Sequence, residues 1–295
     1  MAASKKARER LKEAMSKSLA DTPKRQREIA EMVKRPVDWW QAVVRQIRSE
    51  GLWPENRRHR FRGRLIRLFG NTVKVEGCRF SLDSPVIPTH IKGLIASGGY
   101  EAPEREVLRR FLNPKLPVVE FGGSIGVVSC LTNKRLHNPQ EHVVVEANPD
   151  LIPLLEKNRD LNKCRFVVRH QAVAYGCDEI TFYRNDLFLA GNLYNQWDES
   201  PEQAIRVPTV TFKNILDESS FKRVTLICDI EGAEFDLVQH ESDILRERVE
   251  DFMVEIHRQL GDQLADSMLD KLGQIGFRHV YDRNGTYFFR NSRFD

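Results

Sequence analysis

The sequence predicts an α/β domain with a mostly parallel, doubly wound sheet that ends in an antiparallel hairpin, preceded by a basic helical extension. The first observation is the segment VVEFGGSIG over residues 118–126, where an apolar strand runs into a glycine-rich turn and a helix start. This junction is typical of nucleotide-type cofactor sites, because glycine permits positive φ and a close backbone approach. The second is the alternation of strand and helix patterns that follows it. The third is Asn284-Gly285 between two alternating segments, a strong hairpin signal.

The remaining elements follow from local patterns. Alternation on both sides of Glu76-Gly77 predicts a small β-hairpin over 72–82. A loop over 98–104 leads into a helix over 104–112, with Pro103 suited to the first turn. A further helix is expected over 149–162, and a polar stretch over 184–206. The strands after the glycine turn are expected at 142–146, 165–168, 179–183, 207–212, 224–229, 252–256, 277–281 and 287–289.

The two predicted parts, residues 1–70 and residues 71–295, differ in charge. Residues 1–70 hold 19 Lys and Arg against 8 Asp and Glu, a net charge of +11, whereas the remainder carries −7. An amphipathic helix is expected over 37–47, and residues 57–64 form the densest basic run. This pattern fits a polyanionic partner such as nucleic acid, a phosphorylated glycan or an anionic membrane surface. It fits equally a solvated extension that docks on its own acidic domain.

Length and composition limit the classes of protein to which the chain can belong. A chain of 295 residues with 41% hydrophobic and 30% charged residues suits a globular α/β domain plus an extension. No apolar run approaches the roughly 18 residues needed for a transmembrane segment, and no secretory signal is recognised. The five cysteines are scattered without a CxxC pair, which predicts a reduced, cytoplasmic protein without a zinc site.

Acidic residues stand at the predicted carboxyl ends of three strands: Glu120, Glu146 and Asp229. Ligands bind at this edge of open α/β sheets. Glu146 lies 24 residues after Gly122, near the offset of about 20 at which an acid binds a ribose diol. Glu120, just before the turn, would repel a pyrophosphate and attract S-adenosylmethionine, which carries a sulfonium and an ammonium. The order G-G-S-I-G also departs from the G-x-G-x-x-G of dinucleotide sites.

The segment CDIEGAEFD, residues 228–236, forms a second acidic constellation. Asp229 is expected to point into the crevice, while Glu231 and Glu234 begin a helix, where the dipole favours acids in any case. His257 follows the next strand and is a candidate base for a substrate hydroxyl, oriented by Asp229 or Glu255. The candidate catalytic residues are therefore Asp229, Glu231 and His257.

These segments resemble the FkbM family, S-adenosylmethionine-dependent methyltransferases of the Rossmann-like class I type, whose seven-stranded sheet ends in an antiparallel hairpin. The resemblance covers about residues 82–290, and the D-x-E-G-A-E block is its most specific part. The matching segments are IASGGYEAPEREVLRRFL (95–112), VVEFGGSIGVVSCL (118–131), VVVEANPDLIPLLEKN (143–158), HQAVA (170–174), CDIEGAEFDLV (228–238) and VEIH (254–257).

The resemblance implies O-methylation of a hydroxyl on a sugar or small metabolite, with S-adenosylmethionine as donor. It places Glu146 and Ala147 at the ribose, Gln171 and Ala172 near the adenine, and Tyr100-Glu101 over the donor. It places Glu120, Gly122 and Gly126 at the methionine part, and Gly123, Ser124 and Asp229 are further predicted cofactor-binding residues. The chain departs from the family pattern in two places, since the first acid is often Asp and the turn usually reads G-A-N-I-G.

Two other functions fit the sequence alone. A nucleic-acid methyltransferase would use the basic N-terminal part as its RNA-binding arm. A non-catalytic protein would keep the fold as a cofactor-binding or scaffolding module. A divalent cation at Asp229 and its neighbours, acidifying the acceptor hydroxyl, is compatible with the sequence but not required by it.

Overall fold

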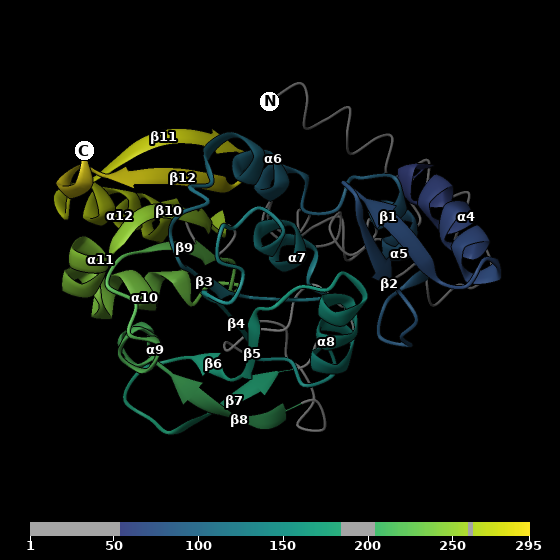
Figure 1. Cartoon of the computed structure of the whole chain (residues 1–295), viewed down its shortest axis with the longest axis horizontal. Coiled ribbons are helices and arrows are strands. Elements are labelled where there is room, and N and C mark those ends of the chain that lie inside the picture. Colours follow the sequence, from purple (N-terminus) through teal and green to yellow (C-terminus); the bar gives the residue numbers. More distant parts are fainter. Residues whose placement is uncertain (1–53, 184–203, 259–261) are drawn as a thin grey trace, which may run out of the picture. The chain divides into compact units, whose positions relative to one another are not determined.

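The computed structural model describes residues 54–183, 204–258 and 262–295 (Figure 1). The predicted helix over 37–47 and most of the polar stretch over 184–206 lie outside the described residues. Residues 57–295 form one compact unit, which contains the sheet and the cofactor crevice. None of the described helices combines the length and apolarity needed to cross a bilayer.

A seven-stranded sheet forms the centre of this unit, with the strand order β11-β12-β10-β9-β3-β4-β5. Only β12 runs against its neighbours, so the predicted mostly parallel sheet with a terminal antiparallel hairpin is confirmed. Asn284 (φ 52°) and Gly285 (φ 96°) form the hairpin turn, as their sequence predicts. The strands are β3 (Val118–Phe121), β4 (His142–Glu146), β5 (Val167–His170), β9 (Val224–Cys228), β10 (Val249–Glu255), β11 (Phe277–Arg283) and β12 (Thr286–Asn291).

The strand order reverses between β3 and β9. From β3 the chain adds β4 and β5 on one side, then returns to place β9 and β10 on the other. Such a switch point opens a crevice at the carboxyl ends of the two strands, where α/β proteins bind ligands. Asp229 N donates to Phe121 O at 2.9 Å, which ties the two strand ends together. The crevice therefore lies between the glycine turn and the loop after β9.

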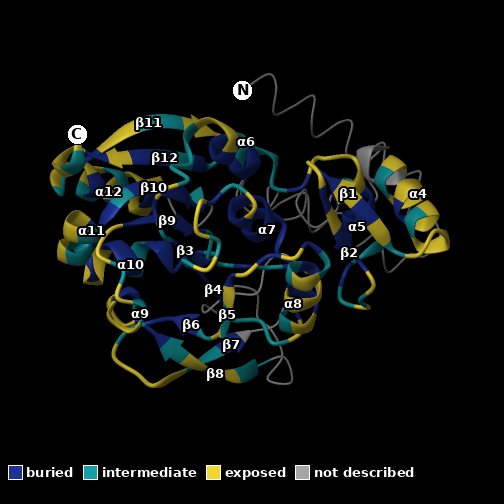
Figure 2. Cartoon of the chain, in the orientation of Figure 1, coloured by how far each residue is buried: buried dark blue, intermediate teal, exposed yellow. Residues whose placement is uncertain are grey.

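Helices cover both faces of the sheet because the strand residues alternate between two apolar clusters (Figure 2). In β3, Val118 packs on one face while Val119 and Phe121 pack on the other. The first cluster includes residues of α5 (Thr89–Ala96), α6 (Ala102–Phe111), α7 (Val127–Asn133) and α8 (Ile152–Leu161). The second includes residues of α9 (Phe212–Ser219), α10 (Glu234–His240), α11 (Ser242–Arg248) and α12 (Asp262–Gln274).

The predicted β-hairpin is present as β1 (Thr72–Val75) and β2 (Cys78–Ser81). It docks on α8 through two asparagine side chains that take the place of a neighbouring strand. Asn162 Oδ1 accepts from Arg79 N at 2.8 Å, and its Nδ2 donates to Arg79 O at 2.7 Å. Asn158 Oδ1 accepts from Ser81 N at 2.7 Å, and its Nδ2 donates to Ile125 O at 2.9 Å. The hairpin is thereby fixed to the glycine turn.

The observed strand bounds differ in detail from the predicted ones. The third strand of the sheet begins two residues later than expected, at Val167. The segments near 180 and 207 do not join the main sheet. They are β7 (Glu179–Tyr183) and β8 (Ala204–Val210), which with β6 (Ala172–Val173) form a separate three-stranded sheet in the order β6-β8-β7. This sheet supplies Phe182 to the cavity at the switch point.

Candidate functional site

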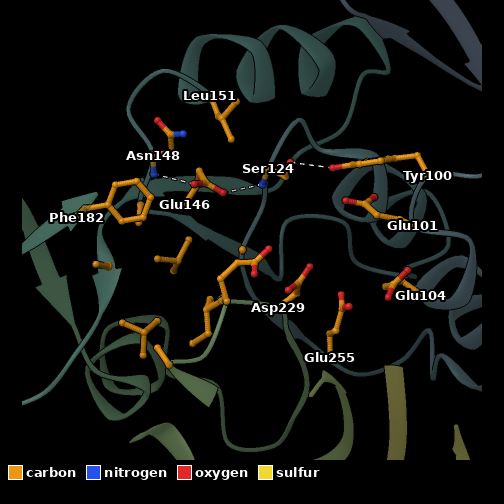
Figure 3. Close-up of a pocket in the computed structure, with 18 of the residues that line it drawn as sticks. Tyr100, Glu101, Glu104, Ser124, Glu146, Asn148, Leu151, Phe182, Asp229 and Glu255 are labelled. Atoms are coloured by element: carbon orange, nitrogen blue, oxygen red, sulfur yellow. Dashed lines mark hydrogen bonds between the residues drawn. The ribbon is translucent and has the colours of Figure 1, made fainter. Parts of the chain in front are cut away.

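A cavity of about 360 Å³ lies at the carboxyl ends of β3, β4 and β9 (Figure 3). Ten of the predicted site residues line it, drawn from the loop before α6, the glycine turn, the ends of β4 and β9 and the segment after β5. They are Tyr100, Glu101, Gly122, Ser124, Glu146, Ala147, Gln171, Ala172, Asp229 and Glu231. The four others, Gly123, Gly126, Glu120 and His257, are near it but do not line it.

The glycine turn is shaped by packing within the protein. Gly122 has φ +90°, and a Cβ there would lie 1.8 Å from Asp229 O, so only glycine lets β3 and the loop after β9 meet. A Cβ on Gly123 would lie 2.5 Å from Val144 Cγ1. Gly126 is the left-handed residue that begins α7, with φ +84°. Gly123 and Gly126 are thus needed for the packing and conformation of the turn, while Gly122 and Ser124 line the cavity.

Glu146 is fixed by the backbone on both sides of the crevice. Its Oε2 accepts from Ser124 N and its Oε1 from Asn148 N, each at 2.7 Å (Figure 3). Burial raises the pKa of this carboxyl, and the backbone amides act in the opposite direction. Each oxygen keeps a second lone pair, so the carboxylate can still accept two hydroxyl donors. This suits a vicinal diol.

Tyr100 and Glu101 reach the cavity from a loop that a buried arginine holds in place. The Tyr100 hydroxyl lies 3.0 Å from Ser124 Oγ, and Glu101 adopts a left-handed conformation with φ 47°. Arg105 donates from Nε to Tyr100 O at 3.1 Å and from Nη2 to Gly98 O at 2.5 Å. Its Nη1 pairs with Glu76 of the β1–β2 turn at 3.0 Å. Arg105 therefore positions both side chains, a role the sequence does not reveal.

Glu120 has a different environment from the one the sequence suggests. It is 1% exposed, and it accepts from Ser129 Oγ at 2.5 Å while His142 Nε2 lies 3.1 Å from its other oxygen. Both carboxylate oxygens are therefore engaged inside the fold. Glu120 lines a smaller adjoining cavity rather than the main one. The geometry gives it an internal partner in place of the direct contact expected with the methionine part.

The D-x-E-G-A-E segment forms a tight loop stabilised by its last acid. Glu234 is fully buried and accepts from Ile230 N at 2.8 Å and from Gly232 N at 2.7 Å. Glu231 has φ 54°, and this left-handed conformation turns the chain back between Asp229 and Gly232. Asp229 and Glu231 line the cavity as a result. Glu234, which the sequence treats as a helix-start acid, is the residue that holds the loop closed.

His257 lies behind the cavity wall and is 5% exposed. Its Nε2 lies 3.2 Å from Glu231 Oε2, and its Nδ1 lies 3.3 Å from Glu234 Oε1. Burial alone would lower the pKa of this imidazole, but its interactions with Glu231 and Glu234 outweigh burial and raise the pKa to about 12. A histidine that is protonated at neutral pH does not accept a further proton. The geometry therefore favours a role for His257 in orienting Glu231, and it argues against the predicted base.

Asp229, Glu231 and His257 bring one potential ligand atom each to within 4.8 Å of one another. His257 Nε2 lies 3.2 Å from Glu231 Oε2 and 3.7 Å from Asp229 Oδ1, so the three side chains form an ion-pair network in this structure.

Glu104 and Glu255 also line the cavity; Glu255 was expected only as a residue that could orient His257, and Glu104 was not predicted. Glu255 ends β10, and the strand-end rule used for Glu120 and Glu146 would have found it. Burial raises the pKa of Glu255 to about 7, with Glu104, Glu231 and Glu234 adding to the shift and His257 opposing it. Burial, followed by Glu255 and Glu231, raises the pKa of Asp229 well above its usual value. One side of the cavity thus holds several carboxyl groups that keep their protons to a higher pH than usual.

Comparison with known proteins identifies the family of the chain. Residues 120–279 match the model of the methyltransferase FkbM domain. A search of curated protein sequences finds no match. Solved structures that resemble the chain include a ribosomal protein L11 methylase from Lactobacillus delbrueckii subsp. bulgaricus (11% identity, 63% of this chain and 74% of that chain, TM-score 0.36). They also include M. jannaschii TYW2 in complex with AdoMet (14%, 74% and 82%, TM-score 0.37) and a Bacillus cereus O-methyltransferase in complex with SAH (9%, 63% and 76%, TM-score 0.35). Because the family model matches more than half of its residues, the chain belongs to the FkbM family of S-adenosylmethionine-dependent methyltransferases.

Proposed function

We propose that the protein transfers a methyl group from S-adenosylmethionine to a hydroxyl of an uncharged sugar, glycan or small metabolite. The donor fits the cavity: Glu146 would bind the ribose diol, and Ala172 and Phe182 line an apolar wall suited to adenine. Two buried carboxylate oxygens, Glu101 Oε2 and Asp229 Oδ1, accept no hydrogen bond from any described residue. Burial raises the pKa of both groups well above its usual value, and a bound cation would stabilise their charged form. When bound, S-adenosylmethionine supplies a methyl group on a positively charged sulfur that leaves as a neutral thioether.

The observation that supports an uncharged acceptor is the charge of the cavity wall. Six carboxyl groups line the cavity, and none of its described lining residues is Lys, Arg or His: Glu101, Glu104, Glu146, Asp229, Glu231 and Glu255. A phosphate or carboxylate near the transferred methyl would find no basic partner among the described lining residues, and each ionised carboxylate of the wall would repel it. A hydroxyl can instead donate its hydrogen bond to one of the acids. An RNA backbone therefore fits the point of transfer poorly.

In this proposal the carboxylate of Glu255 accepts the proton of the acceptor hydroxyl as the new carbon–oxygen bond forms. Its pKa of about 7 is close to the value at which a general base works best at neutral pH. Asp229 lies beside the same end of the cavity and orients the hydroxyl, while His257 holds Glu231 in place. The remaining contribution is the alignment of acceptor and donor in a closed site, which the rigid loop after β9 favours.

Methyl transfer from radiolabelled S-adenosylmethionine tests the proposed acceptor class. The protein is incubated with cell extract that has been separated into neutral glycans and small molecules, lipids, RNA and anionic metabolites. Label is expected in the neutral fraction, and Glu255→Gln should lower its rate of appearance by about 100-fold, whereas donor affinity should fall by no more than about tenfold. Label confined to RNA or to anionic metabolites would contradict the proposal.

Donor affinity is expected to rise with pH between about 6 and 8. Below its pKa of about 7 the Glu255 carboxyl is neutral and attracts no cation, whereas above it the carboxylate attracts the sulfonium. The gain should reach about tenfold, with proton release on binding. Calorimetry in buffers of different ionisation enthalpy measures both. S-adenosylhomocysteine, which lacks the sulfonium charge, and Glu255→Gln should each show a flatter profile. A donor affinity that falls as the pH rises would contradict this prediction.

Arg105 provides a test of the proposed donor contacts at Tyr100 and Glu101. Replacing Arg105 with methionine removes the bonds to the carbonyls of residues 98 and 100, so the loop should loosen and donor affinity fall about tenfold. Arg109→Met is the matched control, since Arg109 also pairs with Glu76 but is half exposed and does not bind these carbonyls. Donor titrations of the two variants at one temperature make the comparison. Equal effects would show that the charge of Glu76, and not the loop, is responsible.

A further inference from the structure

The helix α4 (Pro54–Leu68) is the feature of the described unit that methyl transfer does not use. Its rotation is fixed by close backbone contact with α5. A Cβ on Gly63 would lie 1.8 Å from Thr89 O, and a Cβ on Gly93 would lie 1.8 Å from His59 O. Ile66 packs against the apolar cluster on the same side. The face that bears His59, Gly63 and Ile66 is therefore the inner face of α4.

The outer face carries an apolar stripe. Phe61, Leu65, Leu68 and the following Phe69 are 64%, 38%, 78% and 81% exposed. Their spacing of four, three and one residues places them within an arc of about 100° on the helix. They are four of the six large hydrophobic side chains that are exposed among the described residues, the others being Val167 and Leu264. An apolar patch gathered on one helix marks an interaction site.

Arginines flank this stripe on both sides. At 100° per residue, Arg62 falls along one border and Arg64 along the other, Arg58 falls within the stripe, and Arg60 and Arg67 lie farther round the helix. All five are exposed. No acidic residue interrupts the sequence from 58 to 69. None of the five arginines forms an ion pair with another described residue. Positive charge and apolar surface therefore occupy the same outward face.

We propose that α4 binds an anionic lipid bilayer surface, lying in the headgroup region with the stripe Phe61, Leu65, Leu68 and Phe69 turned toward the acyl chains. Such a helix combines apolar insertion with attraction of arginine to acidic headgroups. A nucleic acid would complement the positive charge of this surface but not all of its apolar side chains. Phosphates would pair with the arginines and bases could stack on Phe61 and Phe69, but Leu65 and Leu68 would stay exposed, whereas a bilayer buries all four apolar side chains.

Vesicle flotation with the full-length protein tests this surface. The protein is mixed with vesicles of phosphatidylcholine alone or of phosphatidylcholine with phosphatidylglycerol. Binding is expected only to the anionic vesicles. The apolar variant Phe61→Ser/Leu65→Ser should lower it at least tenfold, and the charge variant Arg62→Gln/Arg64→Gln should lower it by about 25-fold, near fivefold per charge.

Matched controls lie elsewhere on the same unit. Val167→Ser/Leu264→Ser removes two exposed apolar side chains, and Lys222→Gln/Arg246→Gln removes two exposed charges, so both pairs should bind as the wild type does. Unchanged affinity for S-adenosylmethionine shows that each variant is folded. The proposal is overturned if the wild type does not bind anionic vesicles, or if the apolar variant binds them as well as the wild type. It is also overturned if RNA competes away the vesicles and binds the apolar variant unchanged, because the partner would then be a nucleic acid.

Discussion

Replacing Glu146 with alanine is expected to weaken S-adenosylmethionine binding by about 100-fold. The variant loses the acceptor proposed for the ribose diol, and it also leaves the amides of Ser124 and Asn148 without the carboxylate that now joins them. Glu146→Gln should be intermediate, because its amide group turns an N–H toward one of these backbone donors. Isothermal titration of the donor, below the unfolding temperature of each variant, measures the effect.

Glu156→Ala on α8 is the control for this experiment. Glu156 is half exposed, and its one described ion pair, with Arg159, spans 4.0 Å. Its removal should leave donor affinity within twofold of the wild type. A Glu146→Ala protein that is folded and binds the donor normally would show that the ribose is held elsewhere.

Gly122→Ala should be the most destabilising single substitution in the site, costing more than about 3 kcal/mol of the free energy of unfolding. The added Cβ would lie 1.8 Å from Asp229 O. Residues 122 and 229 directly follow the paired central strands β3 and β9, so neither backbone can move aside. The left-handed backbone at φ +90° adds strain of about 1–2 kcal/mol. Thermal unfolding should show a decrease in Tm of about 10 °C.

The variant Gly77→Ala distinguishes the effect of backbone strain from that of the steric clash. Gly77 has φ +91°, almost the angle of Gly122, but no atom lies within 4 Å of its would-be Cβ. It should therefore lose only about 1–2 kcal/mol. If the two variants unfold at the same temperature, backbone strain alone explains the glycine, and the close approach of β3 and the loop after β9 has no energetic consequence.

The fold was predictable because its signals are local. The hairpin around Asn284-Gly285, the glycine turn and the buried apolar strands β3, β4 and β9 each leave a pattern within a few residues. The separate sheet β6-β8-β7 was not predicted, since short strands at similar spacing do not reveal with which sheet they pair. Register at β5 depends in the same way on tertiary contacts with β4.

The site was predictable to the extent that strand ends define it. Glu146 and Asp229 follow strands that meet at the switch point, so topology alone brings them to one cavity. The environments of Glu120 and His257 depend on side chains distant in sequence. His142 and Ser129 contact the carboxylate of Glu120, and Glu231 and Glu234 flank the imidazole of His257. Neither arrangement has a signature in the sequence.

The central claim is that the cavity at the ends of β3, β4 and β9 holds the methyl donor with its ribose on Glu146. A crystal structure of the protein with S-adenosylhomocysteine tests it most directly. Electron density is expected to show the ribose hydroxyls on Glu146, the adenine beside Phe182 and the thioether sulfur facing Asp229. Density for the nucleoside outside this cavity, or with its ribose away from Glu146, would contradict the claim.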